Sequence, residues 1–328
     1  MKTAYTTNIK KLTGRQETVP FILLVAVLII SMGMSESFRD LGFLLRTSTR
    51  YMELGLTALS MTFIIVGGMI DLSVPSVMCC SATIAALSFH AGLPMGAAIL
   101  CGLATGVVCG LFNGFLIAWL KLPAMIVTIG TMSLFRGVSQ ILIGDKGVGN
   151  FPAWFNGIDK RLVFQAGTVR FSVTILFFII MTVLFFLVLH RTSFGRMIFS
   201  IGSNEQAAIH SGINTRMVKM ILFVLSGIIA SIAGMATMSR LLLVRYDMNL
   251  NTEIEVVIMV LLGGADINGG RGSILGTFIA VILVIILKTG LITAHVTSDA
   301  QMALMGLILL VSIIIPNINT LMQELRDK

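Results

Sequence analysis

Long apolar runs, separated by short polar segments, repeat along the whole chain. A helix of about 20 apolar residues crosses a hydrocarbon core of roughly 30 Å, and most of these runs are close to that length. Charged residues are nearly absent from the interiors of the runs. The pattern predicts about ten membrane-spanning helices, at residues 19–34, 52–70, 74–91, 95–119, 123–143, 171–189, 217–239, 254–267, 273–292 and 300–316.

The composition agrees with this pattern. Hydrophobic residues make up 56% of the 328 residues, charged residues make up 12%, and the mean hydropathy is +0.97. In soluble domains, about a quarter of all residues are charged. The expected fold class is therefore an all-α polytopic membrane protein, with an N-terminal segment at 1–18, a membrane domain at 19–316 and a tail at 317–328.

The first eighteen residues are basic, and no small-residue cleavage site follows the first apolar run, which we interpret as an uncleaved anchor. A basic start favours a cytoplasmic N-terminus, and an even number of spans returns the C-terminus to the same side. Over the whole chain the 23 lysines and arginines divide almost evenly between the two sides, so the orientation depends on this segment and on the family resemblance given below. Its charged residues are Lys2, Lys10, Lys11, Arg15 and Glu17.

Several kinds of chemistry are not expected. The net charge of +8 comes without a basic stripe interleaved with aromatic residues on a water-facing domain, so nucleic acid is not an expected partner. The cysteines lie inside predicted spans, where a thiol behaves as a small apolar group, and the histidines lack the spacing of metal ligands. These residues are Cys79, Cys80, Cys101, Cys109, His90, His190, His210 and His295.

The chain shows no energy source of its own. Its carboxylates Asp71, Glu253, Glu255 and Asp266 lie near the ends or breaks of apolar runs, without the carboxylate–histidine relay of a proton-driven carrier. The glycine-rich segment 263–273, GGADINGGRGS, lacks the lysine of a phosphate-binding loop. Active transport would therefore take its energy from another polypeptide. No catalytic cluster is visible, so we expect no enzyme, and a stand-alone secondary transporter or channel for a small polar solute is the alternative.

A short polar segment between two apolar runs is patterned like a capped helix. Ser203 and Gln206 form the S-x-x-Q pattern of a capping box, with Glu205 in the first turn. Gly212 supplies the left-handed residue that ends a helix, and the next residue can pack back on Ala208. The pattern predicts a helix over 204–211, which is too short to be stable alone and must dock against something.

Basic residues flank this predicted helix and hold the segment on the cytoplasmic face. A short capped helix in this position is one that a soluble motor subunit could grip, and an ordinary surface loop at the lipid interface is the alternative. The flanking residues are Arg191, Arg196, Arg216 and Lys219.

Glycine pairs interrupt two of the apolar runs. Freed backbone N–H and C=O groups cost several kcal/mol each in hydrocarbon unless protein or water satisfies them, so such breaks belong to a translocation path or to a helix end. Asp71 follows the first break and could cap the next helix or contact a substrate, and capping is the interpretation we favour. The break glycines are Gly67, Gly68, Gly263, Gly264, Gly269 and Gly270.

Neutral polar side chains between the breaks are candidates for the lining of the translocation path, because a neutral sugar needs hydroxyl and amide partners. The alternative is that they join transmembrane helices to one another. The candidates are Asp71, Ser73, Asn113, Thr128, Thr131, Ser133 and Arg136. Gly102, Gly106 and Gly110 repeat every four residues and mark a closely packed helix face, against a helix of this chain or of a partner.

Four segments in a fixed order resemble the membrane permease subunits of ribose-type ABC importers. They are MTFIIVGGMIDLSVPSVM (61–78), GLFNGFLIAWLKLPAMIVTIGTMSLFRGVSQIL (110–142), TSFGRMIFSIGSNEQAAIHSGINTRMVK (192–219) and LLGGADINGGRGSILGT (261–277). This resemblance implies a type II importer-like permease domain in the bacterial inner membrane, which carries monosaccharides or the autoinducer signal. It also implies a second permease copy or paralogue, cytoplasmic ATPase subunits that bind ATP and Mg, a periplasmic binding protein, and contact with membrane lipid.

In this family the third segment meets the ATPase, so the resemblance assigns coupling to residues 191–216. Two positions depart from the family pattern: Met69 precedes Ile70, and Pro75 stands where glycine is usual. Proline fixes φ and removes a donor, so this break should be stiffer than in relatives. The expected coupling residues are Gly195, Gly202, Ser203, Asn204, Glu205, Gln206, Ala207, Ala208 and Gly212.

Overall fold

The structure is a computed structural model that describes residues 17–167, 169–297, 299–308 and 310. Helices dominate it, and a further apolar helix at Asp299–Ile308 follows the labelled ones. The labelled helices are α2 (Thr18–Met34), α3 (Leu41–Ser48), α4 (Met52–Val66), α5 (Val74–His90), α6 (Met95–Ala118), α7 (Ala124–Ile143), α8 (Val173–Arg191), α9 (Ser193–Ser203), α10 (Glu205–His210), α11 (Thr215–Leu241), α12 (Glu253–Leu262) and α13 (Ile274–Thr293).

The fold is not purely helical, because two small antiparallel sheets form in the loops. The first pairs β1 with β4, and the second pairs β2 with β3. Short 3-10 turns accompany them at η1 (Glu36–Arg39), η2 (Thr49–Tyr51) and η3 (Ile158–Lys160). The strands are β1 (Val148–Gly149), β2 (Leu162–Ala166), β3 (Val169–Ser172) and β4 (Leu243–Val244).

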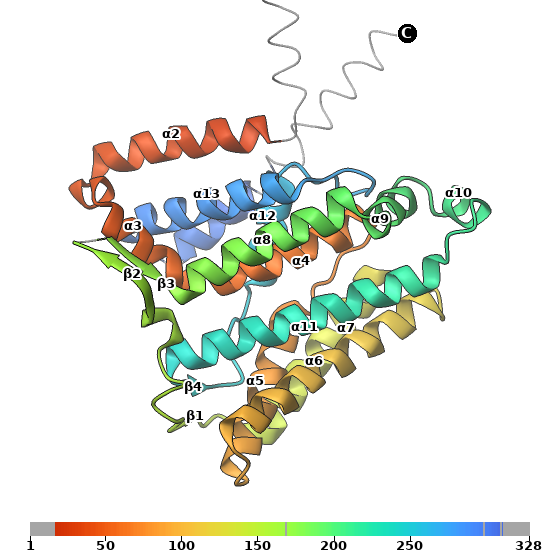
Figure 1. The fold of residues 1–328 in the computed structure, drawn as a ribbon, viewed down its shortest axis with the longest axis horizontal. Helices are drawn as coiled ribbons and strands as arrows, with labels where there is room; N and C mark the ends of the chain where they lie inside the picture. The colour runs from red at the N-terminus through yellow and green to blue at the C-terminus, as the bar shows by residue number, and fades with distance from the viewer. Residues whose placement is uncertain (1–16, 168, 298, 309, 311–328) are drawn as a thin grey trace, which may run out of the picture.

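The long helices run between two ends of the molecule (Figure 1). The strands and α3 lie at one end, and α9 and α10 lie at the other. α8 lies beside α4 and α13, α6 and α7 form the opposite edge, and α11 passes between these two groups. The strand end and the α10 end are therefore separated by the length of the membrane-crossing helices.

The predicted number of spans is not confirmed. Twelve labelled helices, α2 to α13, occur in the described part of the chain, and α3 and α9 were not expected. Five of the described helices are long and apolar enough to cross a membrane, namely α6, α7, α8, α11 and α13. The runs 52–70 and 254–267 overestimate their helices, which end at Val66 and Leu262 because glycine pairs come directly after them.

Other predicted boundaries shift for local reasons. The run 171–189 begins as helix only at Val173, since the preceding residues pair as strand β3. Residues 1–16 and 311–328 lie outside the described residues, and so do most of the predicted N-terminal segment, the end of the span 300–316 and the tail.

The glycine face of α6 packs on α11 of the same chain. A Cβ on Gly106 would overlap the Gly227 carbonyl, and a Cβ on Gly110 would overlap the carbonyl oxygen of Phe223. The backbones therefore approach more closely than larger residues permit. This answers the question that the spacing of these glycines left open, since the partner is a helix of this chain.

α4 is the central helix of the bundle. Every residue of α4 is buried, and the helix is packed by α8, α11, α12 and α13. Apolar residues lie on all sides of the helix, as expected of a helix with no water-facing side. The helix is therefore surrounded by protein up to the first glycine break, where Gly67 is still buried and Gly68 is exposed.

Candidate coupling and translocation sites

The candidate coupling segment consists of two short helices joined by a kink at Asn204. Asn204 is the N-cap of α10, with φ −163° and ψ 103°, and its Oδ1 accepts a hydrogen bond from the N–H of Ala207 at 3.0 Å. The predicted Ser203 cap is therefore wrong. Ser203 is the last residue of α9, so the helix continues through it and the chain leaves the helix only at Asn204. The helix spans Glu205–His210 rather than 204–211.

The end of α10 has the predicted left-handed closure. Gly212 has φ +81°, and the N–H of Ile213 donates to the carbonyl of Ala208 at 3.1 Å. These are the features of a Schellman motif. The Glu205 carboxylate forms an ion pair with Lys219 at 2.6 Å, so α10 is tied to the first turns of α11.

α10 presents one small residue outward beside a groove. Ala208 is buried, whereas Ala207 is exposed. A groove of about 390 Å³ lies between α9 and α10 and includes Ser200, Ser203 and Ala207 in its lining. A second cavity, of about 760 Å³, lies between α10 and the α6–α7 connection. The exposed side of α10 is thus accessible to another protein.

The two glycine breaks share one backbone conformation. At the end of α4, Gly68 has φ +76° and the N–H of Met69 donates to Ile64 at 3.0 Å. At the end of α12, Gly264 has φ +87° and the N–H of Ala265 donates to Val260 at 3.3 Å. Both helices therefore end in Schellman motifs whose left-handed residue is the second glycine of the pair.

Three segments meet at a point that we call the glycine junction: Gly68 after α4, Gly202 in α9, and Gly269–Gly270 between α12 and α13. The N–H of Gly270 donates to the Val66 carbonyl at 2.8 Å. A Cβ on Gly202 would overlap that same carbonyl oxygen and would lie 2.5 Å from the Gly270 nitrogen. The contacts are made by main chain, so only glycine fits there.

The junction has further ties to the neighbouring helices. A Cβ on Gly195 would overlap the Leu189 carbonyl, so the turn from α8 into α9 also needs glycine. The His190 Nε2 accepts a hydrogen bond from the N–H of Ile274 at 3.3 Å, which joins the end of α8 to the start of α13. The candidate coupling helices are therefore fixed to the bundle at several points.

Asp71 lies at the centre of a buried polar network. Its Oδ1 accepts hydrogen bonds from the N–H of Ser73 at 3.0 Å and from the Ser73 hydroxyl at 2.5 Å. Its Oδ2 accepts from the Ser226 hydroxyl at 3.0 Å. The Asn113 Nδ2 donates to Ser73 Oγ at 2.8 Å, while the Asn113 Oδ1 is buried without a hydrogen-bond partner among the described residues. The network joins the α4–α5 break to α6 and α11.

These contacts favour the capping interpretation of Asp71 in a modified form. The carboxylate accepts from the N–H of Ser73, which is the N-cap residue of α5, rather than from the first turn of the helix itself. Three donors occupy its two oxygens. Ser226 was not among the predicted residues, because it is one of three serines in the apolar run 217–239 and its position in the sequence does not indicate its partner.

The remaining translocation candidates lie in three different settings. Thr128 is buried and its hydroxyl donates to the Ile70 carbonyl at 3.3 Å, so it belongs beside the polar network. Among the described residues, the hydroxyls of Thr131 and Ser133 form hydrogen bonds only within α7, and Ser133 is exposed. Arg136 donates to the carbonyls of Tyr246 and Met248 at 2.7 and 2.6 Å, which fixes the loop after β4.

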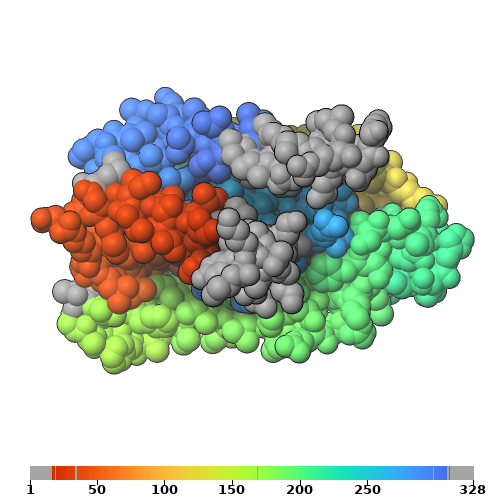
Figure 2. Space-filling model, turned by 90° about the horizontal axis from the view of Figure 1, so that it is seen from above, coloured from red at the N-terminus to blue at the C-terminus, as the bar shows by residue number. Residues whose placement is uncertain are grey.

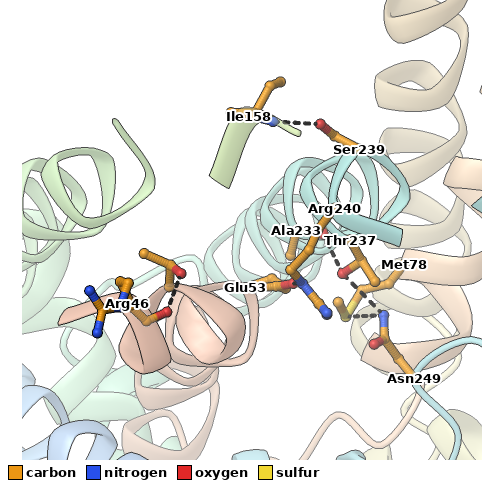
Figure 3. Close-up of polar contacts among 10 residues, drawn as sticks. Arg46, Glu53, Met78, Ile158, Ala233, Thr237, Ser239, Arg240 and Asn249 are labelled. Atoms are coloured by element: carbon orange, nitrogen blue, oxygen red, sulfur yellow. Dashed lines mark hydrogen bonds and ion pairs between the residues drawn. The ribbon is translucent and has the colours of Figure 1, made fainter. Parts of the chain in front are cut away.

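A buried ion pair at the strand end was also missed. Figure 3 shows Arg240 at the end of α11 reaching Glu53 at the start of α4, and their Nε and Oε1 atoms are 2.5 Å apart. Glu53 is 3% exposed. Sequence spacing could not reveal this pair, because the two residues come together only when α4 and α11 pack.

The comparisons with family models and with known proteins agree with each other. The family described as “Branched-chain amino acid transport system / permease component” matches residues 43–313. The “Autoinducer 2 import system permease protein LsrD” of Escherichia coli (strain K12) and that of Shigella flexneri are each 32% identical over 311 residues, which covers 93% of this chain and 93% of each relative. No solved structure matches the chain.

Proposed function

Because this chain belongs to the family of permease components of branched-chain amino acid transport systems, we propose that it carries a small neutral substrate of the monosaccharide class as the permease subunit of an ABC importer. It is a multi-pass inner-membrane protein, and it is not itself an enzyme. The finer fold assignment, a type II importer-like arrangement of about ten spans with both termini in the cytoplasm, is part of the proposal.

The substrate class rests on the relatives and on the chemistry of the polar network. The named relatives import autoinducer 2. The network presents hydroxyl and amide groups, with the Asn113 Oδ1 as an acceptor that has no partner within the described residues. Hydroxyl donors of a sugar-like molecule are the complement of such a group. Asp71, Ser73, Asn113 and Thr128 are therefore our candidates for the translocation path.

The glycine junction is the observation that carries the proposed coupling. Main-chain contacts join Gly202 to Val66 and Gly270, so a displacement of α9 and α10 reaches α4 and the α12–α13 connection without flexible side chains between them. A rigid element transmits displacement, whereas a loose loop absorbs it. In the proposed cycle, two ATPase subunits bind ATP and Mg, close, and move α10 of each permease.

The permease then rocks as a rigid body and opens to accept substrate from a periplasmic binding protein. A second copy or a paralogue of the chain forms the other half of the pathway, and lipid surrounds both. The chain supplies no chemistry of its own in this cycle. The coupling residues are Gly195, Gly202, Asn204, Glu205, Ala207, Ala208 and Gly212, with Ser203 and Gln206 at the surface of the same segment.

An Ala207→Glu variant tests the coupling role. Ala207 is exposed beside the α9–α10 groove, and an unpaired charge desolvated in a docking interface costs several kcal/mol. We expect normal membrane abundance, weakened co-purification of the ATPase and loss of ATP-dependent uptake. Ala153→Glu is the matched control, because Ala153 is exposed in the loop that carries β1. Wild-type uptake and full ATPase binding by Ala207→Glu would assign α10 to an ordinary surface.

A further inference from the structure

A basic cavity of about 430 Å³ lies at the end of the molecule opposite α10. It is formed where η2, the β2–β3 hairpin and the end of α11 meet. Figure 2 shows the N-terminal helices beside the hairpin segment, and α3 contacts β3. Five cations line the cavity, namely Arg46, Arg50, Lys160, Arg170 and Arg240.

The charges of this cavity do not balance. Arg46 pairs with Asp40 at 3.7 Å, and Arg240 pairs with the buried Glu53. Within the described residues, no carboxylate forms an ion pair with Arg50, Lys160 or Arg170. Asp159 is the one carboxylate of the lining. Three unpaired cations therefore face one acid, and an anion would be attracted to the cavity.

The cavity lies beside the start of a helix that can span a membrane. Ser172 lines the cavity and is also the N-cap of α8, a helix long and apolar enough to cross the membrane. A spanning helix begins near the edge of the hydrocarbon core, and we infer from this that the cavity lies near the level of the lipid phosphates. Basic side chains at the ends of spans commonly reach that level.

An exposed apolar stripe runs from this cavity along α8. Its residues recur at helical spacing and therefore share one face of the helix. Figure 1 shows α8 on the outside of the bundle, so this face is available to an acyl chain. The stripe consists of Val173, Phe177, Ile180, Leu184 and Leu187.

We propose that the basic cavity binds the phosphate headgroup of an anionic phospholipid, with an acyl chain along the α8 stripe. Phe164 of the hairpin is 60% exposed, which suits a bilayer interface better than a water-facing surface. The site also gives a reason for the cations that collect at this end of the chain. The inference needs only that the chain spans the membrane, and it does not depend on the coupling role of α10.

The test measures lipid binding to the full chain in mild detergent by native mass spectrometry. Dioleoylphosphatidylglycerol is the anionic probe, and dioleoylphosphatidylcholine is the zwitterionic comparison. We expect the parent protein to retain the anionic lipid preferentially. Lys160→Gln combined with Arg170→Gln should weaken that binding about tenfold to thirtyfold. The reason is that each cation near the headgroup strengthens the binding of an anionic lipid by electrostatic attraction, and the two contributions multiply in the binding constant.

The matched control is Lys146→Gln combined with Arg245→Gln, which removes two exposed cations from other loops that do not line the cavity. It should bind the anionic lipid like the parent. Equal retention of the two lipids by the parent, or equal losses in the two double variants, would overturn the proposal. Displacement of the lipid by inorganic phosphate at the same concentration would overturn it in favour of a free-anion site.

One further outcome would assign the cavity to a different partner. If the Lys160/Arg170 double variant keeps the anionic lipid but loses association with an acidic soluble protein, the cavity is a protein-docking surface and the lipid proposal fails. If that variant does not accumulate, the parent still decides the matter through the two lipids and the phosphate competition.

Discussion

The ends of α4 and α12 share one backbone conformation and lead into two different surroundings. Both end in a glycine pair whose second member is left-handed. After Gly68 the chain enters the bundle, and Asp71 is 3% exposed in the polar network. After Gly264 the chain forms a turn at the surface, where the Asp266 Oδ1 accepts from the N–H of Asn268 at 2.9 Å.

The difference shows that the glycine pair ends the helix but does not determine the path of the chain beyond it. In the first break, Ser226 of the neighbouring helix α11 donates a hydrogen bond to the Asp71 carboxylate. In the second, the turn closes on itself through the N–H of Asp266 and the Arg271 carbonyl at 3.0 Å. The second break is then free to contact α9 through its later glycines, Gly269 and Gly270.

The largest expected effect is at the point where the two breaks meet. Gly270 has φ +73°, and a Cβ there would lie 2.5 Å from the Ser203 Oγ. Gly270→Val and Gly202→Val should each lower the amount of folded protein severely, because backbone must move to admit the side chain. The measurement is membrane abundance with thermal unfolding of the purified protein.

Gly130→Val in α7 is the control for these variants, since a Cβ at Gly130 meets nothing within 4 Å. It should accumulate normally. A Gly270→Val protein with normal abundance and uptake would show that the junction has no structural importance.

A smaller loss of stability is expected when the aspartates of the two breaks, Asp71 and Asp266, are replaced, and it should differ between them. Asp71→Ala removes the acceptor of three hydrogen bonds and should destabilise the protein by roughly 2 kcal/mol or more, because buried donors lose their partner. Asp266→Ala removes one acceptor at the surface and should cost about 0.5 kcal/mol. The measurement is the thermal unfolding midpoint of both variants. Equal shifts would contradict the distinction between a buried and a surface break.

A local effect, without loss of folded protein, is expected at the third left-handed glycine of this kind. Gly212 has φ +81° and open space around it, so Gly212→Ala should cost about 1 kcal/mol locally through backbone strain. Abundance should stay normal while ATP-dependent uptake falls. Gly96→Ala, at an open position in α6, is the control and should leave uptake unchanged. A normal uptake rate for Gly212→Ala would show that closure of α10 is not needed for coupling.

Local signals located the glycine breaks but not the exact helix ends, and they did not reveal the contacts between distant segments. Glycine pairs in apolar runs indicated the breaks after α4 and α12, because the left-handed conformation is a property of one residue. The cap at Asn204 was misplaced by one residue, since the sequence could not show that α9 continues through Ser203.

The assembly of the sites could not be predicted in the same way. Gly68, Gly202 and Gly270 meet through main-chain atoms, which leave no pattern of side-chain chemistry in the sequence. Ser226 reaches Asp71 only because α11 packs against the first break. The candidate site was therefore predicted as a set of residues, while its geometry depended on the packing of helices.

The glycine junction also has a consequence for biosynthesis. Val66 and Gly202 are made well before Gly270, whose N–H closes the contact with the Val66 carbonyl. A chain emerging from the ribosome folds from its N-terminal part first, so the α4 end and α9 must wait beside one another until the last third of the protein is inserted. Until then the Val66 carbonyl lacks this donor. Completion of the junction is thus a late event in the maturation of the protein, and a chain that ends before Gly270 cannot form this hydrogen bond.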